Sequence, residues 1–215
     1  MIPAHIRPLK LRQSTKYMRL LFATSNLNKA KELSLLVPEK YELITLNDID
    51  LNEEIPETSD TLEGNAQQKS NYIIENFSMD CFADDTGLEV NALNDEPGVR
   101  SARYAGEQRS DEDNMQLLLN NLSTKTDRSA QFRTVISLEM NGQKHLFEGI
   151  VTGNIRTKKS GVNGFGYDPI FEPENCGKTF AEMTTTEKNN FSHRARAFDK
   201  MIAFLEKKLK DRRNV

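Results

Sequence analysis

The sequence feature that most constrains the fold is the run at residues 81–90, where a short apolar segment ends in Asp84 and Asp85. Such a segment predicts a buried strand. We expect Thr86-Gly87 to turn the chain into a second apolar segment, residues 88–93. Because neighbouring residues of a strand point to opposite faces, one acid should act on a ligand while the other orients. A solvated Asp-x-Gly hairpin turn is the alternative that this run leaves open.

Length and composition indicate one domain with a substantial core, built in two lobes at most, because the chain has 215 residues. Hydrophobic residues make up 37% and charged residues 28%, and no window of eighteen apolar residues could span a bilayer. A net charge of −3 argues against broad binding to nucleic-acid backbones. Any anionic ligand must therefore be held locally, by a few cations or by a metal.

The two cysteines, Cys81 and Cys176, do not suggest a disulfide-stapled scaffold, and we expect free thiols in a reducing cytoplasm. Residues 1–17 are basic, lack acids and lack the apolar core of a secretory signal. We expect them to be a disordered extension or to lie upstream of a natural start at Met18, with a transit peptide as the alternative. Residues 18–212 should form the single domain.

Residues 19–24 predict a buried strand, and residues 28–37 carry apolar residues at helical spacing until Pro38 stops the helix. The junction between them brings hydroxyl, amide and ammonium groups to a helix start, where free backbone N–H groups favour anions. It therefore predicts a phosphate-binding segment, and an ordinary capped helix is the alternative. This segment consists of Thr24, Ser25, Asn26, Leu27, Asn28 and Lys29.

A second strand is expected at residues 41–46, followed by an acidic loop at residues 47–60 that contains Glu53, Glu54 and Glu57. Asp60 is predicted to cap the next helix in a capping box with Glu63. That helix should bury a stripe that begins at Leu62, and it also carries Lys69. It leads into the strand that holds the two aspartates.

The middle of the chain predicts further regular elements. A turn-rich stretch with two arginines at residues 97–106 precedes a helix that Ser110 should cap. Apolar runs at residues 130–140 and 144–155 flank Asn141-Gly142, the strongest short signal for a hairpin. The glycine-rich loop at residues 161–169 has the wrong spacing for a dinucleotide site, and its Asp168-Pro169 pair should open a strand-like segment.

The last third of the chain predicts two capped helices. Thr184 and Glu187 form a capping box, and Ser192 should cap the final helix. His193 and Arg194 fall in the first turn of that helix, where cations oppose the helix dipole. This placement suggests that the two charges serve an anionic ligand, with simple exposure to solvent as the alternative.

Five separated segments, taken in order, resemble the inosine triphosphate pyrophosphatase family. They are residues 24–29, Glu57 with residues 63–66, residues 84–88, residues 165–169 and residues 192–194, and 97–98, 101–104 and 177–179 also fit. The resemblance runs from about residue 18 to the end of the last helix. It implies an elongated, two-lobed α/β fold with a central mixed, twisted sheet flanked by helices, an active site in the cleft between the lobes, and a homodimer.

The resemblance further implies hydrolysis of non-canonical purine nucleoside triphosphates (ITP, dITP, XTP) to the monophosphate and pyrophosphate, with Mg²⁺. Asp85 would be the general base and a metal ligand, and Glu57 a second metal ligand. Thr24 to Lys29 would hold phosphates together with Thr86, a position where the family often has serine. Base, sugar and phosphate would be bound by Phe165, Gly166, Tyr167, Asp168, Lys188, His193 and Arg194.

The residue types fit this chemistry. A triphosphate carries about four negative charges, so carboxylates such as Asp85 can lie beside it only when a hard divalent cation intervenes. Lysines and Arg194 could neutralise the phosphate oxygens while a carboxylate positions water. N–H donors, which His193 or Arg194 could supply, would donate a hydrogen bond to the oxygen of a 6-oxopurine. They would reject ATP, because adenine has an amino donor at that position. Pyrophosphatases for other modified nucleotides and a non-catalytic nucleotide sensor remain the alternatives.

Overall fold

The fold is described from a computed structural model, which describes residues 17–51 and 55–213. The predicted extension at residues 1–17 lies outside the described residues apart from Tyr17, and so do Glu53 and Glu54.

Strands and helices alternate in the first half of the chain, and a long hairpin dominates the second. The strands are β1 (Met18–Phe22), β2 (Tyr41–Thr45), β3 (Cys81–Val90), β4 (Pro97–Gly98), β5 (Ser129–Met140), β6 (Gln143–Ile155) and β7 (Phe171–Pro173). The helices are α1 (Leu27–Ser34), α2 (Leu62–Phe77), α3 (Asp111–Asn121), α4 (Thr185–Asn189) and α5 (His193–Arg213).

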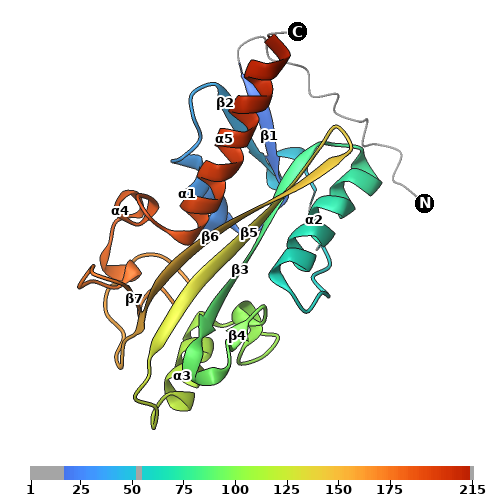
Figure 1. Cartoon of the computed structure of the whole chain (residues 1–215). Coiled ribbons are helices and arrows are strands. Elements are labelled where there is room, and N and C mark those ends of the chain that lie inside the picture. Colours follow the sequence, from blue (N-terminus) through green and yellow to red (C-terminus); the bar gives the residue numbers. More distant parts are fainter. Residues whose placement is uncertain (1–16, 52–54, 214–215) are drawn as a thin grey trace.

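The seven strands of the described residues belong to one sheet with the order β2-β1-β3-β5-β6-β7, and β4 pairs separately with β3. Strand β1 runs parallel to β2 and β3, whereas the other pairs are antiparallel. The long strands β3, β5 and β6 cross the whole molecule as a curved ribbon (Figure 1). The predicted α/β fold with a mixed sheet is therefore confirmed.

The turn predicted at Thr86-Gly87 is wrong, because β3 is one continuous strand. It pairs with β5 residue by residue, from Cys81 opposite Glu139 to Val90 opposite Ala130. Gly87 serves a close approach instead of a turn. A Cβ atom at this position would lie 2.6 Å from the carbonyl oxygen of Gly98 in β4. The hairpin-turn alternative for the two aspartates is excluded in the same way.

The hairpin between β5 and β6 forms as predicted. Asn141 and Gly142 connect the strands with φ angles of 51° and 72°. Positive φ at both central residues is the geometry of a type I′ turn, which matches the twist of the flanking strands. Twelve register pairs extend from this turn, so the hairpin forms the long axis of the sheet.

Alternating side chains place helices on both faces of the sheet. Along β1 and the residue after it, Leu20 and Phe22 belong to a core that α5 covers, whereas Leu21 and Ala23 belong to a core that α2 covers. Figure 1 shows α5 and α2 on opposite sides of the long strands. A separate apolar cluster, with Leu118 of α3 at 0% exposure, fills the far end of the sheet. The first two cores belong to one lobe, and the cluster at the far end forms the other.

Most predicted helix starts are confirmed, and one is wrong. Ser110 and Thr184 cap α3 and α4, and Ser192 Oγ accepts a hydrogen bond from the N–H of Ala195 in α5. For α2, however, the N-cap is Thr61, whose hydroxyl accepts from Gly64 N–H, and not Asp60. The capping box fails because Glu63 stands one position too early.

The start of α5 lies directly on β6, at Gly149. A Cβ atom there would lie 2.0 Å from the carbonyl oxygen of His193 and 2.6 Å from the backbone nitrogen of Ala197. Only a residue without a side chain permits this contact. The glycine thereby fixes where His193 and Arg194 meet the sheet.

Within the described ranges, no helix has both the length and the apolar character needed to cross a membrane.

Candidate active site

The site lies where one edge of β3 is left open. In the described part of the chain, β1 pairs with β3 at Phe22 and Phe82, and β4 pairs with it at Leu88 and Glu89. Between these contacts, no strand is paired with that edge. Side chains from both faces of β3 can therefore reach the same space beside the open edge. This space is a cavity of about 550 Å³. Cavities of this size hold small-molecule ligands.

The cavity brings together most of the residues predicted for the site, from both lobes. The predicted residues that line it are Thr24, Ser25, Asn26, Lys29, Glu57, Asp85, Thr86, Phe165, Gly166, Tyr167, Asp168, Lys188, His193 and Arg194. Leu27 and Asn28 do not line it, and the Leu27 side chain is 68% exposed.

Asp85 is held rigidly on the α2 side of β3. Its Oδ2 accepts a hydrogen bond of 3.0 Å from the Asn65 amide, and its Oδ1 accepts one of 3.0 Å from the N–H of Thr86. Burial raises the pKa of the Asp85 carboxyl, against the opposing effect of nearby Lys69. A buried carboxylate with a raised pKa is a better general base near neutral pH.

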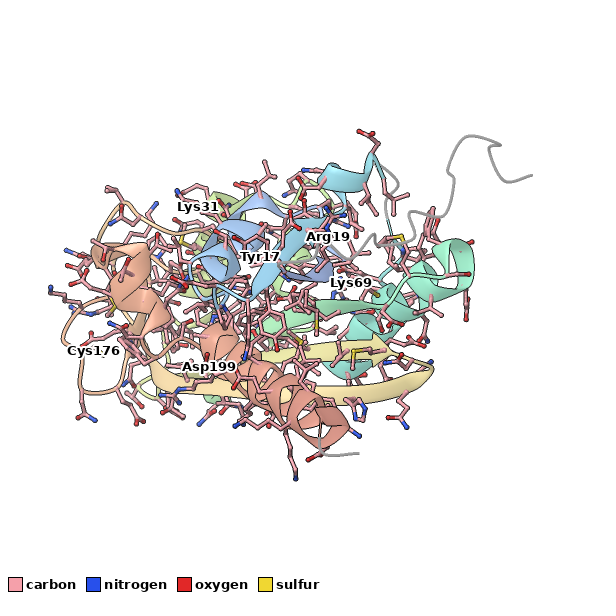
Figure 2. The ribbon with its side chains drawn as sticks, turned by 90° about the horizontal axis from the view of Figure 1, so that it is seen from above. Tyr17, Arg19, Lys31, Lys69, Cys176 and Asp199 are labelled. Carbon is pink, nitrogen blue, oxygen red and sulfur yellow. The ribbon has the colours of Figure 1, made fainter. Side chains whose placement is uncertain are left out.

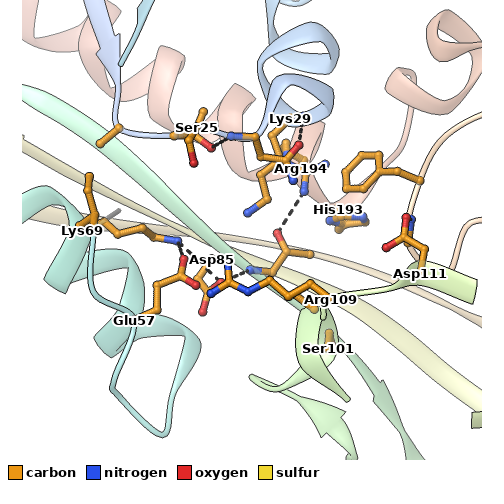
Figure 3. Close-up of a pocket in the computed structure, with 18 of the residues that line it drawn as sticks. Ser25, Lys29, Glu57, Lys69, Asp85, Ser101, Arg109, Asp111, His193 and Arg194 are labelled. Atoms are coloured by element: carbon orange, nitrogen blue, oxygen red, sulfur yellow. Dashed lines mark hydrogen bonds and ion pairs between the residues drawn. The ribbon is translucent and has the colours of Figure 1, made fainter. Parts of the chain in front are cut away.

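Lys69 joins Asp85 to Glu57. The lysine is 7% exposed, and it points inward from α2, in contrast to Lys31 at the outer face of α1 (Figure 2). Its Nζ donates to Glu57 Oε1 and lies 3.9 Å from Asp85 Oδ1 (Figure 3). Burial opposes its charge, yet the two carboxylates raise the pKa of Lys69 above its ordinary value. The charge of Lys69 thus partly neutralises both Glu57 and Asp85.

This arrangement fits a hard metal ion. The described residues contain no group of three or more His, Cys, Asp or Glu side chains that would hold a metal alone. Two carboxylates that already share one positive charge, Asp85 and Glu57, nevertheless match Mg²⁺, which is commonly held by one or two carboxylates and by substrate phosphates.

Asp84 faces the opposite side of β3. Its Oδ1 accepts from Lys29 Nζ at 3.0 Å and its Oδ2 from Arg194 Nε at 3.2 Å. Burial would raise the pKa of Asp84, but these cations outweigh it and hold the pKa well below its ordinary range. The two adjacent acids therefore point to opposite faces as expected, and Asp85 alone of the two lines the cavity.

The start of α1 is an ordinary capped helix. Asn26 Oδ1 accepts from the N–H groups of Asn28 and Lys29, and Thr24 Oγ1 accepts from the N–H of Asn26. The expected free N–H groups are thus already occupied at residues 26, 28 and 29. Helix α1 is also shorter than predicted and ends at Ser34. What this segment offers a ligand is chiefly side chains, above all Lys29, whose pKa burial lowers.

A buried charge cluster joins α1, α4 and α5 behind the cavity. Lys188 Nζ donates to Glu32 Oε1 at 2.7 Å and to Asp168 Oδ2 at 2.6 Å, and Arg194 bonds to Glu32. Burial disfavours the Glu32 carboxylate, but Arg194 and Lys188 hold its pKa below the usual value. At Asp168 burial prevails, and the pKa is raised.

Sequence analysis missed Glu32, although a signal existed. In the helix predicted over residues 28–37, Glu32 lies four residues before Leu36, one of its apolar positions, and so falls on the predicted apolar side. A charged residue at a core position has to meet a buried partner.

The loop at residues 161–169 contributes residues 165–168 to the wall of the cavity. The ring of Phe165 lies 5.1 Å from Lys188 Nζ and 5.6 Å from the guanidinium of Arg194. The N–H of Gly166 donates to Asp111 Oδ2 at 2.7 Å, which ties the loop to α3. Strand β7 begins at Phe171, slightly after the predicted Asp168-Pro169 boundary. The loop therefore presents an aromatic ring held by cations.

His193 differs from the expectation of a cation at the helix start. It is 2% exposed and its ring stacks on Phe132 with centroids 4.7 Å apart. Burial, reinforced by Arg194 and Lys188, places the pKa of His193 well below its ordinary value. The imidazole is therefore neutral. Both the predicted positive charge of His193 and the alternative of exposure to solvent are wrong.

Arg109 is a cavity residue that sequence analysis did not single out. It comes from the segment before α3 with a φ of 51°, and its side chain extends across the cavity toward Asp85 (Figure 3). Burial disfavours the Glu57 carboxylate, but Lys69 above all, and then Lys29 and Arg109, hold the pKa of Glu57 below its ordinary value. The basic residue directly before the Ser110 cap was the available signal.

The fold and the cavity together define an α/β protein whose charged cleft suits a phosphorylated small molecule. A family model described as the Ham1 family matches residues 20–204. The dITP/XTP pyrophosphatase of Flavobacterium psychrophilum is 53% identical over 189 residues, which cover 88% of this chain and 100% of that protein. The chain belongs to the Ham1 family.

Solved structures agree with this assignment. The Ham1 protein of Staphylococcus aureus aligns with a TM-score of 0.80 at 41% identity, over 88% of this chain and 99% of that chain. A HAM1 protein from Coxiella burnetii also gives a TM-score of 0.80, at 34% identity and with the same shares covered.

Proposed function

We propose that this protein is a Mg²⁺-dependent pyrophosphatase that hydrolyses ITP, dITP and XTP to the nucleoside monophosphate and pyrophosphate. Two similar relatives are named dITP/XTP pyrophosphatases, which supports dITP and XTP as substrates. The single observation that carries the chemistry is the pair Asp85 and Glu57 around Lys69, at an open strand edge beside Lys29. We further propose that residues 18–212 form the pyrophosphatase domain and that two copies form a homodimer.

In this mechanism Asp85 is the general base. Its fixed carboxylate would accept a proton from the water that attacks the α-phosphorus, and pyrophosphate would leave. Asn65 and the N–H of Thr86 keep the carboxylate oriented. Because general-base catalysis depends on alignment, these two hydrogen bonds hold the reactive geometry.

Asp85 and Glu57 would hold the magnesium ion, which when bound would neutralise phosphate charge and acidify water. Lys29, Lys69 and Arg109 surround the same space with positive charge. Their side chains would bind the triphosphate and stabilise the charge that builds up on its oxygens.

At the other end of the cavity, the purine would lie against Phe165, with His193, Arg194 and Lys188 near its edge. An aromatic face held by Lys188 and Arg194 is a suitable platform for a flat base. Thr24 and Ser25 would reach the phosphates from the start of α1.

A panel of triphosphates tests the proposal. Release of pyrophosphate and monophosphate is measured for ITP, dITP, XTP, ATP and GTP, each with Mg²⁺ and with a chelator. We expect turnover of the first three that the chelator abolishes. Intact ITP after hours with Mg²⁺, despite tight binding, would favour a nucleotide sensor, and preference for other modified bases would favour a different pyrophosphatase.

A further inference from the structure

A chain of two threonine hydroxyl groups links β3, β5 and the start of α5. Thr86 and Thr134 are directly opposite each other in the sheet, with their Oγ1 atoms 2.6 Å apart. Thr86 Oγ1 lies 3.3 Å from Asp84 Oδ2, and Thr134 Oγ1 lies 2.7 Å from His193 Nδ1. Thr134 is 0% exposed. The chain therefore runs from a carboxylate to an imidazole through two hydroxyl groups.

The carboxylate at the end of this chain, Asp84, can only accept hydrogen bonds. Asp84 forms ion pairs with Lys29 at 3.0 Å and with Arg194 at 3.2 Å. An ionised carboxylate has no proton to donate. Asp84 therefore determines the direction of every hydrogen bond that follows.

From Asp84 the proton directions follow one after another. Thr86 has a single hydroxyl proton and donates it to Asp84, so its lone pairs accept from Arg194 Nη2 and from Thr134. Thr134 has then used its own proton toward Thr86. In this arrangement it can only accept from His193, so Nδ1 of the imidazole carries a hydrogen.

The opposite direction loses one hydrogen bond. If Thr134 donated to His193 Nδ1, Thr86 would have to donate to Thr134. The oxygens of Thr86 and Asp84 would then face each other at 3.3 Å without a proton between them. Arg194 donates to both of these oxygens in either arrangement, so the two arrangements differ by the hydrogen bond from Thr86 to Asp84, which only the first one forms.

The tautomer of His193 determines what the cavity offers a ligand. His193 lines the cavity, and its Nδ1 is held by Thr134. In the described part of the chain, Nε2 forms no hydrogen bond, so it is the ring nitrogen left for a ligand. A neutral imidazole with hydrogen on Nδ1 has a lone pair on Nε2, which makes it an acceptor.

We propose that Thr134 is a positioning residue that fixes His193 in the Nδ1–H tautomer, so that Nε2 accepts the N1–H of a 6-oxopurine base. A 6-oxopurine carries hydrogen on N1, whereas adenine has a lone pair there. Two lone pairs would meet if adenine entered, and ATP would be disfavoured. This inference rests on the proposed function, and it replaces the expectation that His193 supplies a donor.

The tautomer is measured directly on the wild-type protein, without any substrate. Long-range ¹H–¹⁵N spectra of histidine-labelled protein distinguish a protonated from an unprotonated ring nitrogen, and His193→Gln assigns the signals. We expect a protonated Nδ1 and an unprotonated Nε2. Hydrogen on Nε2 would overturn the proposal, even if the protein proved to be the expected pyrophosphatase.

Kinetics test the consequence for specificity. Thr134→Val keeps the shape and removes the hydroxyl, and we expect the ratio of kcat/KM for ITP over ATP to fall about tenfold. The loss should appear in the KM for ITP more than in kcat. Thr134→Ser should restore the ratio, and an unchanged ratio in Thr134→Val would contradict the proposal.

Ser137→Ala is the matched control. Ser137 is a buried hydroxyl on the same strand, paired with Ser70 at 2.9 Å and not lining the cavity. Its removal should leave the ITP-to-ATP ratio and the His193 spectrum unchanged, and a change in either would count against the specific role of Thr134. If no triphosphate is hydrolysed, the proposed function fails, and the spectrum still decides the tautomer.

Discussion

Asp84 and Asp85 are adjacent in β3, yet they belong to different charge clusters on opposite faces of the strand. Asp84 pairs with Lys29 and Arg194, whereas Asp85 accepts from Asn65 and faces Lys69. The first carboxylate has a lowered pKa and the second a raised one. Opposite environments for neighbouring acids are a common way to assign them different roles.

Asp85→Asn should abolish hydrolysis and leave folding intact. Loss of a general base costs about 100- to 10,000-fold in rate. The fold should tolerate a neutral isostere, because burial already favours the uncharged form of Asp85. Single-turnover rates with ITP and thermal unfolding measure the two effects, and turnover like that of the wild type would remove Asp85 as the base.

Asp84→Asn is the matched comparison and should behave in the opposite way. It leaves Lys29 and Arg194 buried with less compensation, so the free energy of unfolding should fall by about 3–5 kcal/mol. Urea denaturation of both variants checks the difference. Equal stability of the two variants would show that the ion pairs of Asp84 contribute little.

Lys29→Ala should raise the KM for ITP about tenfold or more and change kcat less. The lysine lines the cavity from α1, and a contact to phosphate formed in both the ground state and the transition state affects mainly binding. Lys31→Ala, an exposed residue on the same helix, is the control. An unchanged KM in Lys29→Ala would exclude this lysine from phosphate binding.

Local signals in the sequence predicted the elements that depend on local physics. Asn141-Gly142 fixed the hairpin, and Ser110 and Thr184 fixed helix starts, because each acts through its own backbone neighbours. The grouping of most site residues followed from the family resemblance. Their individual roles stay predictions.

The errors and omissions concern relations between distant segments. Gly87 was interpreted as a turn, but it is required by Gly98 of β4, which nothing near residue 87 indicates. The partners of Glu32 lie 156 and 162 residues away. Whether His193 is charged or neutral likewise depends on its burial, which results from stacking on Phe132 and from the packing of α5. The residues next to His193 in the sequence do not indicate either contact.

Gly149→Ala should destabilise the protein and impair activity together. The added methyl group would collide with the backbone of His193 and Ala197, which cannot yield as a flexible side chain could. Overpacking of this kind costs about 1–3 kcal/mol, and displacement of α5 would also move Arg194. Denaturation and ITP turnover are measured beside Thr152→Ala, an exposed position on β6. A variant with unchanged stability would mean that α5 does not lie this close to β6.

The neutral state of His193 predicts how stability depends on pH. The folded protein keeps the pKa of this histidine well below 6.5, whereas in the unfolded chain it titrates near its ordinary value of about 6.5. As the pH falls below about 6.5, the unfolded chain binds a proton that the folded protein does not, so stability falls by about 1.4 kcal/mol per pH unit from this group. Urea denaturation between pH 7.5 and 5 should show this slope in the wild type. His193→Gln removes the titrating group and should flatten the profile by one proton. If both proteins show the same slope, the imidazole is not buried in its neutral form.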